Sequence, residues 1–191
     1  MLEKLKLLLG ITDDSMDSQL SAYLVEAQEY VEDYLERQLT KGDYEDYINM
    51  EYGGFNKIVL RNFPLESIES IENLDGTVID VESVRAIKNV GEVKVPGGLP
   101  AGDYVVQYVG GYDPLPSWAQ RAIIDTAANI HYNVQSGGTS AISGAVKSEE
   151  IYGVAKVMYD TSGSASGEDE GFGHIPETVV DTLEKHKNRY A

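Results

Sequence analysis

Residues 104–133 read YVVQYVGGYDPLPSWAQRAIIDTAANIHYN and hold two different patterns next to each other. The first part combines β-branched and aromatic side chains, which is typical of a strand. Gly110-Gly111 ends that run, and Pro114 and Pro116 mark the approach to a helix with Ser117 as a candidate N-cap. Apolar residues then recur at helical spacing. The stretch predicts a strand that leads directly into a helix.

Two more helices are predicted N-terminal to this stretch. Leu2–Leu9 is a short apolar segment that ends at Gly10, a residue that tolerates the left-handed C-terminal position. A polar cluster at Thr12–Ser18 favours a helix start. The helical apolar period that follows, with an acidic opposite face, predicts a long helix to about Gln38.

Between these helices, residues 43–109 carry short β-rich runs and no helical period. Asp75-Gly76 predicts a hairpin turn, and Pro96-Gly97-Gly98 predicts a turn after the run EVKV. We therefore expect an α+β chain with a mainly helical core, made of the long N-terminal helix, the central helix and a C-terminal helix. A small antiparallel β subdomain is inserted between the helices.

The C-terminal third changes character twice. Residues 147–160, KSEEIYGVAKVMYD, predict a strand or hairpin. Residues 161–173 are rich in Gly, Ser and acids, which indicates a flexible loop. Pro176 opens a final helix, so residues 174–191 form a helical tail. We expect residues 1–191 to form a single domain with these parts.

Composition restricts the function classes. The formal net charge is −17, which disfavours tight binding to a nucleic-acid backbone, yet 42% apolar residues and 13 tyrosines indicate a folded chain. The absence of cysteine excludes disulfides and thiolate metal sites. The apolar run Leu7–Leu9 is too short for a signal peptide or a membrane span, so we expect a soluble protein made in a cytoplasm.

No catalytic or metal-binding set emerges from the sequence. His131, His174 and His186 lie on separate predicted elements, and none has a second ligand at metal spacing. We interpret His131 as a packed or surface residue and His174 as a turn residue. Residues 160–171 loosely resemble a calcium loop, but Ala165 stands where that loop requires glycine. We therefore predict no enzymatic activity and no cofactor.

Five segments in order resemble the head–tail connector (adaptor) proteins of tailed phages and prophages. They are residues 2–35, 59–77, 104–133, 147–160 and 175–190. The strand that ends in Tyr-x-Gly-Gly-Tyr before a proline pair and a helix is the most recognisable of them. The long loop after Asp160 and the sizeable β insertion depart from the family pattern.

The resemblance implies a structural virion protein of the neck, at the head–tail interface, that is assembled in the host cytoplasm. It implies a homo-oligomeric ring, usually dodecameric, docked under the portal protein. Such a ring extends the DNA channel without binding DNA specifically, and it offers a platform for the stopper or tail-completion protein.

Two surfaces are predicted to make these contacts. The C-terminal helix combines apolar and basic side chains that suit docking to the portal. These portal-docking candidates are Val180, Leu183, Lys185, Lys187, Arg189 and Tyr190. The candidates for a subunit or neck interface are Tyr152, Val154, Lys156 and Met158. The alternative for the C-terminal helix is that it packs back on its own subunit.

Two other functions stay open at this stage. The β insertion, the tyrosines and the acidic loop also suit a monomeric virion or surface module that binds sugar or calcium. A hydrolase that relies on carboxylates is the third hypothesis, although no paired arrangement can be argued from so many acids.

Overall fold

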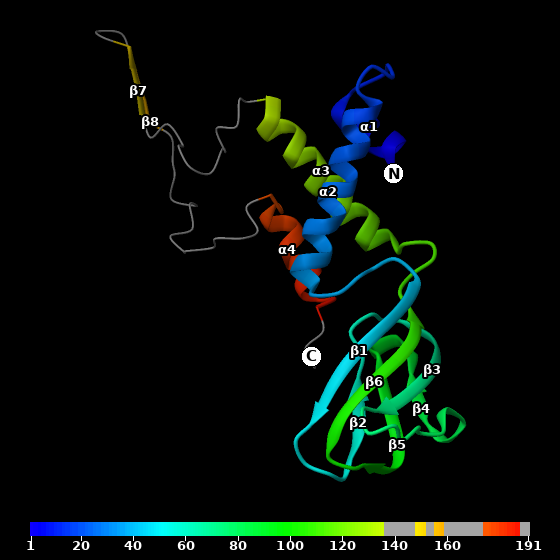
Figure 1. The fold of residues 1–191 in the computed structure, drawn as a ribbon. Helices are drawn as coiled ribbons and strands as arrows, with labels where there is room; N and C mark the ends of the chain where they lie inside the picture. The colour runs from blue at the N-terminus through cyan, green and yellow to red at the C-terminus, as the bar shows by residue number, and fades with distance from the viewer. Residues whose placement is uncertain (136–147, 152–154, 159–173, 188–191) are drawn as a thin grey trace. The chain divides into compact units, whose positions relative to one another are not determined.

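Within the part of the chain that the structure describes, four helices form where the sequence has a helical apolar period. The computed structural model describes residues 1–135, 148–151, 155–158 and 174–187 (Figure 1). The helices are α1 (Leu2–Leu9), α2 (Asp17–Leu35), α3 (Ser117–Gln135) and α4 (Glu177–Glu184). Together with the strands they confirm the α+β class.

Helix α2 ends earlier than the sequence predicts. Glu36 adopts a left-handed conformation with a φ of 57°. Its N–H bonds to the carbonyl of Asp33 at 3.1 Å, and the Arg37 N–H bonds to the carbonyl of Glu32 at 3.1 Å. This is the Schellman pattern that glycine usually supports. The sequence therefore does not show where α2 ends, because the residue at that position is not a glycine. Gly10 ends α1 as predicted, with a φ of 71°.

Helices α3 and α4 are each preceded by a proline. The Gln120 N–H bonds to the Pro116 carbonyl at 3.0 Å, so Pro116 occupies the N-cap position and Ser117 is the first helical residue. The Val180 N–H bonds to the Pro176 carbonyl at 3.1 Å in the same way. The predicted starts of α3 and α4 are thus each corrected by one residue: α3 begins at Ser117 and not after it, and α4 begins at Glu177 and not at Pro176.

The chain divides into two compact units. The first, the helical unit, comprises Met1–Val31 and Arg121–Asp181, and the second, the β unit, comprises Glu32–Gln120 and Thr182–Ala191. In the helical unit, side chains of α2 and α3 meet where the Tyr23 ring contacts the His131 ring edge to face, with ring centroids 6.2 Å apart. Helix α1 is tied to the start of α2 by Lys6, whose Nζ lies 2.8 Å from Asp17 Oδ1.

The β unit contains two three-stranded antiparallel sheets. Its strands are β1 (Gly42–Met50), β2 (Phe55–Val59), β3 (Leu65–Asn73), β4 (Arg85–Ile87), β5 (Glu92–Leu99) and β6 (Gly102–Gly110). One sheet has the order β1-β6-β3 and the other β2-β5-β4 (Figure 1). Short 3₁₀ turns, η1 (Val81–Ser83) and η2 (Lys88–Val90), flank β4.

Both sheets contribute side chains to one apolar core. Its buried members are Met50, Ile58, Leu60, Leu65, Ile71, Val93, Val95, Leu99, Tyr104, Val106 and Tyr108. The prediction of one small sheet was therefore too simple. The β2–β5 pairing joins segments that are far apart in the sequence, and a pattern of local runs does not show it.

One predicted turn is confirmed and one is wrong. At Asp75-Gly76 the chain reverses, because the Gly76 N–H bonds to the Asn73 carbonyl at 2.8 Å. At Pro96-Gly97-Gly98, strand β5 instead continues to Leu99. The pairing with β2 shifts register there, and Gly97 and Gly98 have φ angles of 87° and 77°. The glycines form an irregularity within the strand, which absorbs the extra residues.

A third pairing lies in the C-terminal third. Strand β7 (Ser148–Ile151) pairs antiparallel with β8 (Ala155–Met158). For residues 148–151 and 155–158, this pairing agrees with the strand or hairpin predicted for residues 147–160. The predicted flexible loop, residues 161–173, lies outside the described residues.

Candidate assembly surfaces

The C-terminal helix begins with contacts to its own chain. In the helical unit, the Asn129 side-chain amide donates a hydrogen bond to the His174 carbonyl at 3.0 Å. The His174 ring stacks on Tyr30 with centroids 4.9 Å apart. Ile175 and Val179 are 6% and 4% exposed. The start of the tail is thus anchored by polar and apolar contacts.

The end of the tail is held in the β unit by Arg37. This guanidinium lies over the Phe63 ring, 3.6 Å from its centroid. Its Nη1 donates to the Phe63 carbonyl at 2.8 Å, and its Nη2 donates to the His186 carbonyl at 3.1 Å. Burial lowers the pKa of Arg37 from its usual value. One buried cation therefore connects the chain that follows α2, the β2–β3 loop and the C-terminal segment.

Aromatic and charged side chains complete this attachment. The His186 and Trp118 rings stack in parallel, 4.0 Å apart with an interplanar angle of 5°. Lys187 Nζ lies 3.0 Å from Glu36 Oε1, and the Tyr34 hydroxyl donates to Glu184. Burial, followed by the charges of Arg37 and Lys185, lowers the pKa of His186.

These contacts change how the portal-docking candidates are placed. Leu183 is fully buried, so its side chain would have to leave the core of its own subunit to contact a partner. Val180 is half-buried, and Lys187 is paired with Glu36. Lys185 is exposed. Arg189 and Tyr190 lie outside the described residues. The structure thus places the helix against its own subunit, and its docking role stays a prediction.

The predicted subunit or neck interface lies on the β7–β8 hairpin. Lys156 pairs with Glu150 across the hairpin, and Met158 pairs with Ser148. Tyr152 and Val154 lie outside the described residues. The interface role of these four residues stays a prediction.

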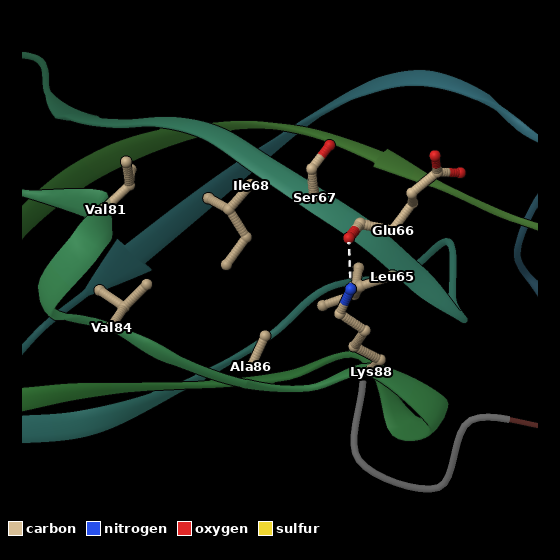
Figure 2. A pocket seen from close by; sticks show the side chains of 8 residues that line it. All are labelled: Leu65, Glu66, Ser67, Ile68, Val81, Val84, Ala86 and Lys88. Carbon is tan, nitrogen blue, oxygen red and sulfur yellow. Dashed lines mark hydrogen bonds between the residues drawn. The ribbon is translucent and has the colours of Figure 1, made fainter.

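A hollow of about 170 Å³ lies beside strand β3. Figure 2 shows Ile68, Val81 and Val84 lining it, with Lys88 at one end. The Lys88 ammonium donates to the Glu66 carbonyl at 2.7 Å (Figure 2). The lining is therefore mainly aliphatic, and its one cation is bonded to the backbone.

The histidines are packed or stacked on aromatic rings. His131 is 7% exposed and contacts Tyr23 and Tyr132, which agrees with its interpretation as a packed residue. His174 lies in a turn as expected. Among the described residues, no group of three His, Cys, Asp or Glu side chains is placed to hold a metal ion. The calcium-loop candidate, residues 160–171, lies outside them.

The residues that hold the tail could not be identified from local sequence patterns. Arg37 follows a helix end that only the structure reveals. From the sequence alone, a single arginine near acidic residues is interpreted as a solvent-exposed charge. Trp118, the only tryptophan, could have been singled out as a packing site by its position at the start of a predicted helix.

The fold now defined is an α+β chain in which amphipathic helices precede and follow a two-sheet β insertion in the sequence. The family comparison supports the resemblance seen in the sequence. Residues 1–61 match the model of the phage gp6-like head-tail connector protein family, which confirms that resemblance for this part of the chain. No curated protein matches the chain. No helix in the described ranges is long and apolar enough to cross a membrane.

Solved structures show the same fold over more of the chain. One is a chain from the neck of an empty GTA particle computed with C6 symmetry. It has a TM-score of 0.55 and 14% identity over 69% of this chain and 76% of that chain. Another is a chain from the virion of a native gene transfer agent (GTA) particle. It has a TM-score of 0.50 and 16% identity over 62% of this chain and 68% of that chain.

Proposed function

We propose that this chain is a structural neck protein, a head–tail connector that assembles as a ring between a portal and the tail-side proteins. The observation that carries the proposal is the match of residues 1–61 to the gp6-like head-tail connector family. The fold shared with a chain from the neck of a gene transfer agent particle supports it over more of the length.

The ring is the finer part of the proposal. The neck chain of similar fold comes from a particle computed with C6 symmetry, which is a closed rotational arrangement. A dodecameric ring satisfies that symmetry. The net charge of −17 suits a channel wall, since basic walls would grip a passing duplex. The proposed role is structural and not catalytic.

The proposed partners are the portal protein on one side and a stopper or tail-completion protein on the other. Among the described portal-docking candidates, Lys185 is exposed, so its side chain can contact a partner without leaving its own subunit. The proposed location is the virion neck, after assembly in the host cytoplasm.

Co-sedimentation with purified portal rings, together with native mass spectrometry of the mixture, tests the proposal. We expect a complex with a fixed number of copies per portal. A chain that stays monomeric with and without the portal, and never sediments with it, contradicts the proposal. A free monomer alone does not, because ring closure can require the portal as a template.

A further inference from the structure

The two sheets of the β unit carry opposite charge. Strands β1, β6 and β3 hold seven acidic residues and no lysine or arginine. Strands β2, β5 and β4 hold three basic residues and one acid. In a chain with 32 acidic and 15 basic residues, this separation within one small unit is unexpected.

The basic residues form a single row across their sheet. Lys57 lies opposite Lys94 on β5, and Lys94 lies opposite Arg85 on β4. Directly opposed residues of antiparallel strands point to the same face. The next row, Ile58 and Val93, is buried in the core, so the cation row faces outward. We call this surface the basic face.

The basic face is only partly neutralised. Glu92 Oε2 lies 2.8 Å from Lys57 Nζ, and Glu92 Oε1 lies 3.4 Å from Lys94 Nζ. Within the described part of the chain, Arg85 forms no ion pair. Like charges directly opposite each other destabilise a sheet. The direct opposition of three cations is therefore a local cost that an anionic partner surface would offset.

The other sheet supplies a surface of matching character. Six of its seven acids are exposed, and the pairing register puts four of these on the side away from the core. They are Asp43, Glu45, Glu72 and Asp103. Tyr47, which is 70% exposed, lies in the row of Val105 and Glu72. We call this surface the acidic face.

The two faces point away from each other. The inward side chains of both sheets meet in one core, so each outer face is on the far side of that core from the other. One chain therefore cannot bring its own basic face to its acidic face. Two copies can, and each then keeps one face free for the next copy. Contacts between unlike patches of identical chains produce rings or filaments.

We infer that the basic face of one copy docks on the acidic face of the next, head to tail. This inference rests on the proposed function, because it names the surfaces that join neighbouring subunits. Apolar residues accompany the charges on both faces, with Val59 and Ile87 on the basic side and Tyr47 and Val105 on the acidic side. Such mixed faces give contact area as well as electrostatic steering.

Disulfide trapping tests the contact, since the chain contains no cysteine. Ile87→Cys labels the basic face and Gln107→Cys labels the acidic face, and neither removes a charge. Equal amounts of the two variants, one carrying a mass tag, are oxidised mildly at about 0.1 M salt, where the Debye length is about 10 Å. We expect mixed dimers in several-fold excess over same-variant dimers, both alone and on portal rings.

Charge reversal makes the test specific. Lys94→Glu in the Ile87→Cys chain should reduce the mixed dimer several-fold. Adding Glu72→Lys to the Gln107→Cys chain should restore it. Lys4→Glu on α1 changes the net charge by the same amount as Lys94→Glu but lies on neither face, so it should leave the yield unchanged.

The outcomes separate this inference from the proposed function. Rings or portal complexes without mixed cross-links overturn the head-to-tail contact and leave the connector role intact. Binding of duplex DNA to the protein is measured in parallel. If Lys94→Glu abolishes DNA binding but not cross-linking, the basic face binds phosphate groups and the inference is again wrong. Failure of both cross-linking and portal binding overturns both proposals.

Discussion

Buried backbone N–H and C=O groups find their hydrogen-bond partners in different ways in the helical unit and the β unit. In the helical unit, the buried backbone lies mostly in helices, where it is bonded internally. Most of its core is apolar, as at Leu20, Ala27 and Ile123, and its buried polar residues include Lys6, Thr126 and His131. The β unit includes buried irregular segments around Arg37–Leu39 and Asn62. Their N–H groups need acceptors that the sheets do not supply.

Side chains provide those acceptors. The Leu39 N–H bonds to Glu32 Oε1 at 3.1 Å, and the Gln38 N–H bonds to Asn62 Oδ1 at 2.7 Å. The Asn62 N–H bonds in turn to the Tyr108 hydroxyl at 3.0 Å. The helical unit should therefore be sensitive mainly to lost volume. The β unit should also be sensitive to single polar atoms.

The C-terminal segment contributes to both units, so its removal should have the largest effect. Deleting residues 175–191 exposes the contacts of Ile175, Val179 and Leu183, each worth about 1.5–3 kcal/mol when fully buried. It also removes the His186 carbonyl from the buried Arg37. We expect a loss of about 5 kcal/mol or more, measured by urea denaturation.

This prediction reverses the one suggested by the sequence, in which the tail is a dispensable docking element. A truncated chain that melts like the full chain but no longer binds portal rings would restore the sequence-based view. A chain that unfolds or aggregates supports the packing seen here.

The next largest effect should come from the apolar core of the helical unit. Leu20→Ala removes a fully buried side chain, and we expect a loss of about 2–5 kcal/mol. Leu7→Ala is the matched control, because Leu7 is 83% exposed on α1 and should cost less than about 0.5 kcal/mol. Thermal melting of both variants measures the difference. Equal losses would mean that Leu7 is covered in solution.

A smaller effect should follow from one oxygen in the β unit. The Tyr108 hydroxyl donates to Asp46 Oδ2 at 3.1 Å and accepts from the Asn62 N–H. Tyr108→Phe leaves that N–H and one carboxylate position without a partner, at an expected cost of about 1–3 kcal/mol. Tyr52→Phe is the control, since Tyr52 is 71% exposed. A neutral Tyr108→Phe would show that water replaces the hydroxyl.

The sequence predicted the helices and turns that depend on local residue patterns. Helical spacing and Gly10 placed α1 and most of α2, and the Asp75-Gly76 turn was found because its residues are typical of a hairpin. The end of α2 at Glu36 was missed because a glutamate there is atypical. Strand pairing was missed because register is a long-range property. The cation row exists only through the pairing of Lys57, Lys94 and Arg85.

The same limit applies to the candidate surfaces. The amphipathic character of α4 was visible, but an apolar helix face does not reveal whether its own subunit or a partner covers it. Burial of Leu183 and the bond from Arg37 to His186 assign that face to the subunit. Neither contact has a local sequence signature, because Arg37 and His186 are separated by most of the chain.

The smallest predicted effect is a pH dependence of the C-terminal attachment. His186 is stacked on Trp118, its carbonyl accepts from Arg37, and Lys185 adds a second positive charge nearby. Glu36 faces the same segment but is paired with Lys187. Burial and the two cations lower the pKa of His186 in the folded chain, so the unfolded chain binds this proton more readily. Stability should therefore fall as the pH drops through the unfolded pKa of about 6.5 and should level off below the folded pKa.

Urea denaturation between about pH 8 and about pH 5 measures this effect. Unfolding is monitored by the fluorescence of Trp118, which is the only tryptophan in the chain. Carboxylates also titrate toward the acidic end of the range, so the informative quantity is the difference between the wild type and His186→Gln. That variant cannot gain the proton and should show a weaker loss of stability near pH 6. Identical slopes for the wild type and His186→Gln would mean that the imidazole gains its proton as easily in the fold as in the unfolded chain. The stacking on Trp118 would then not require a neutral ring.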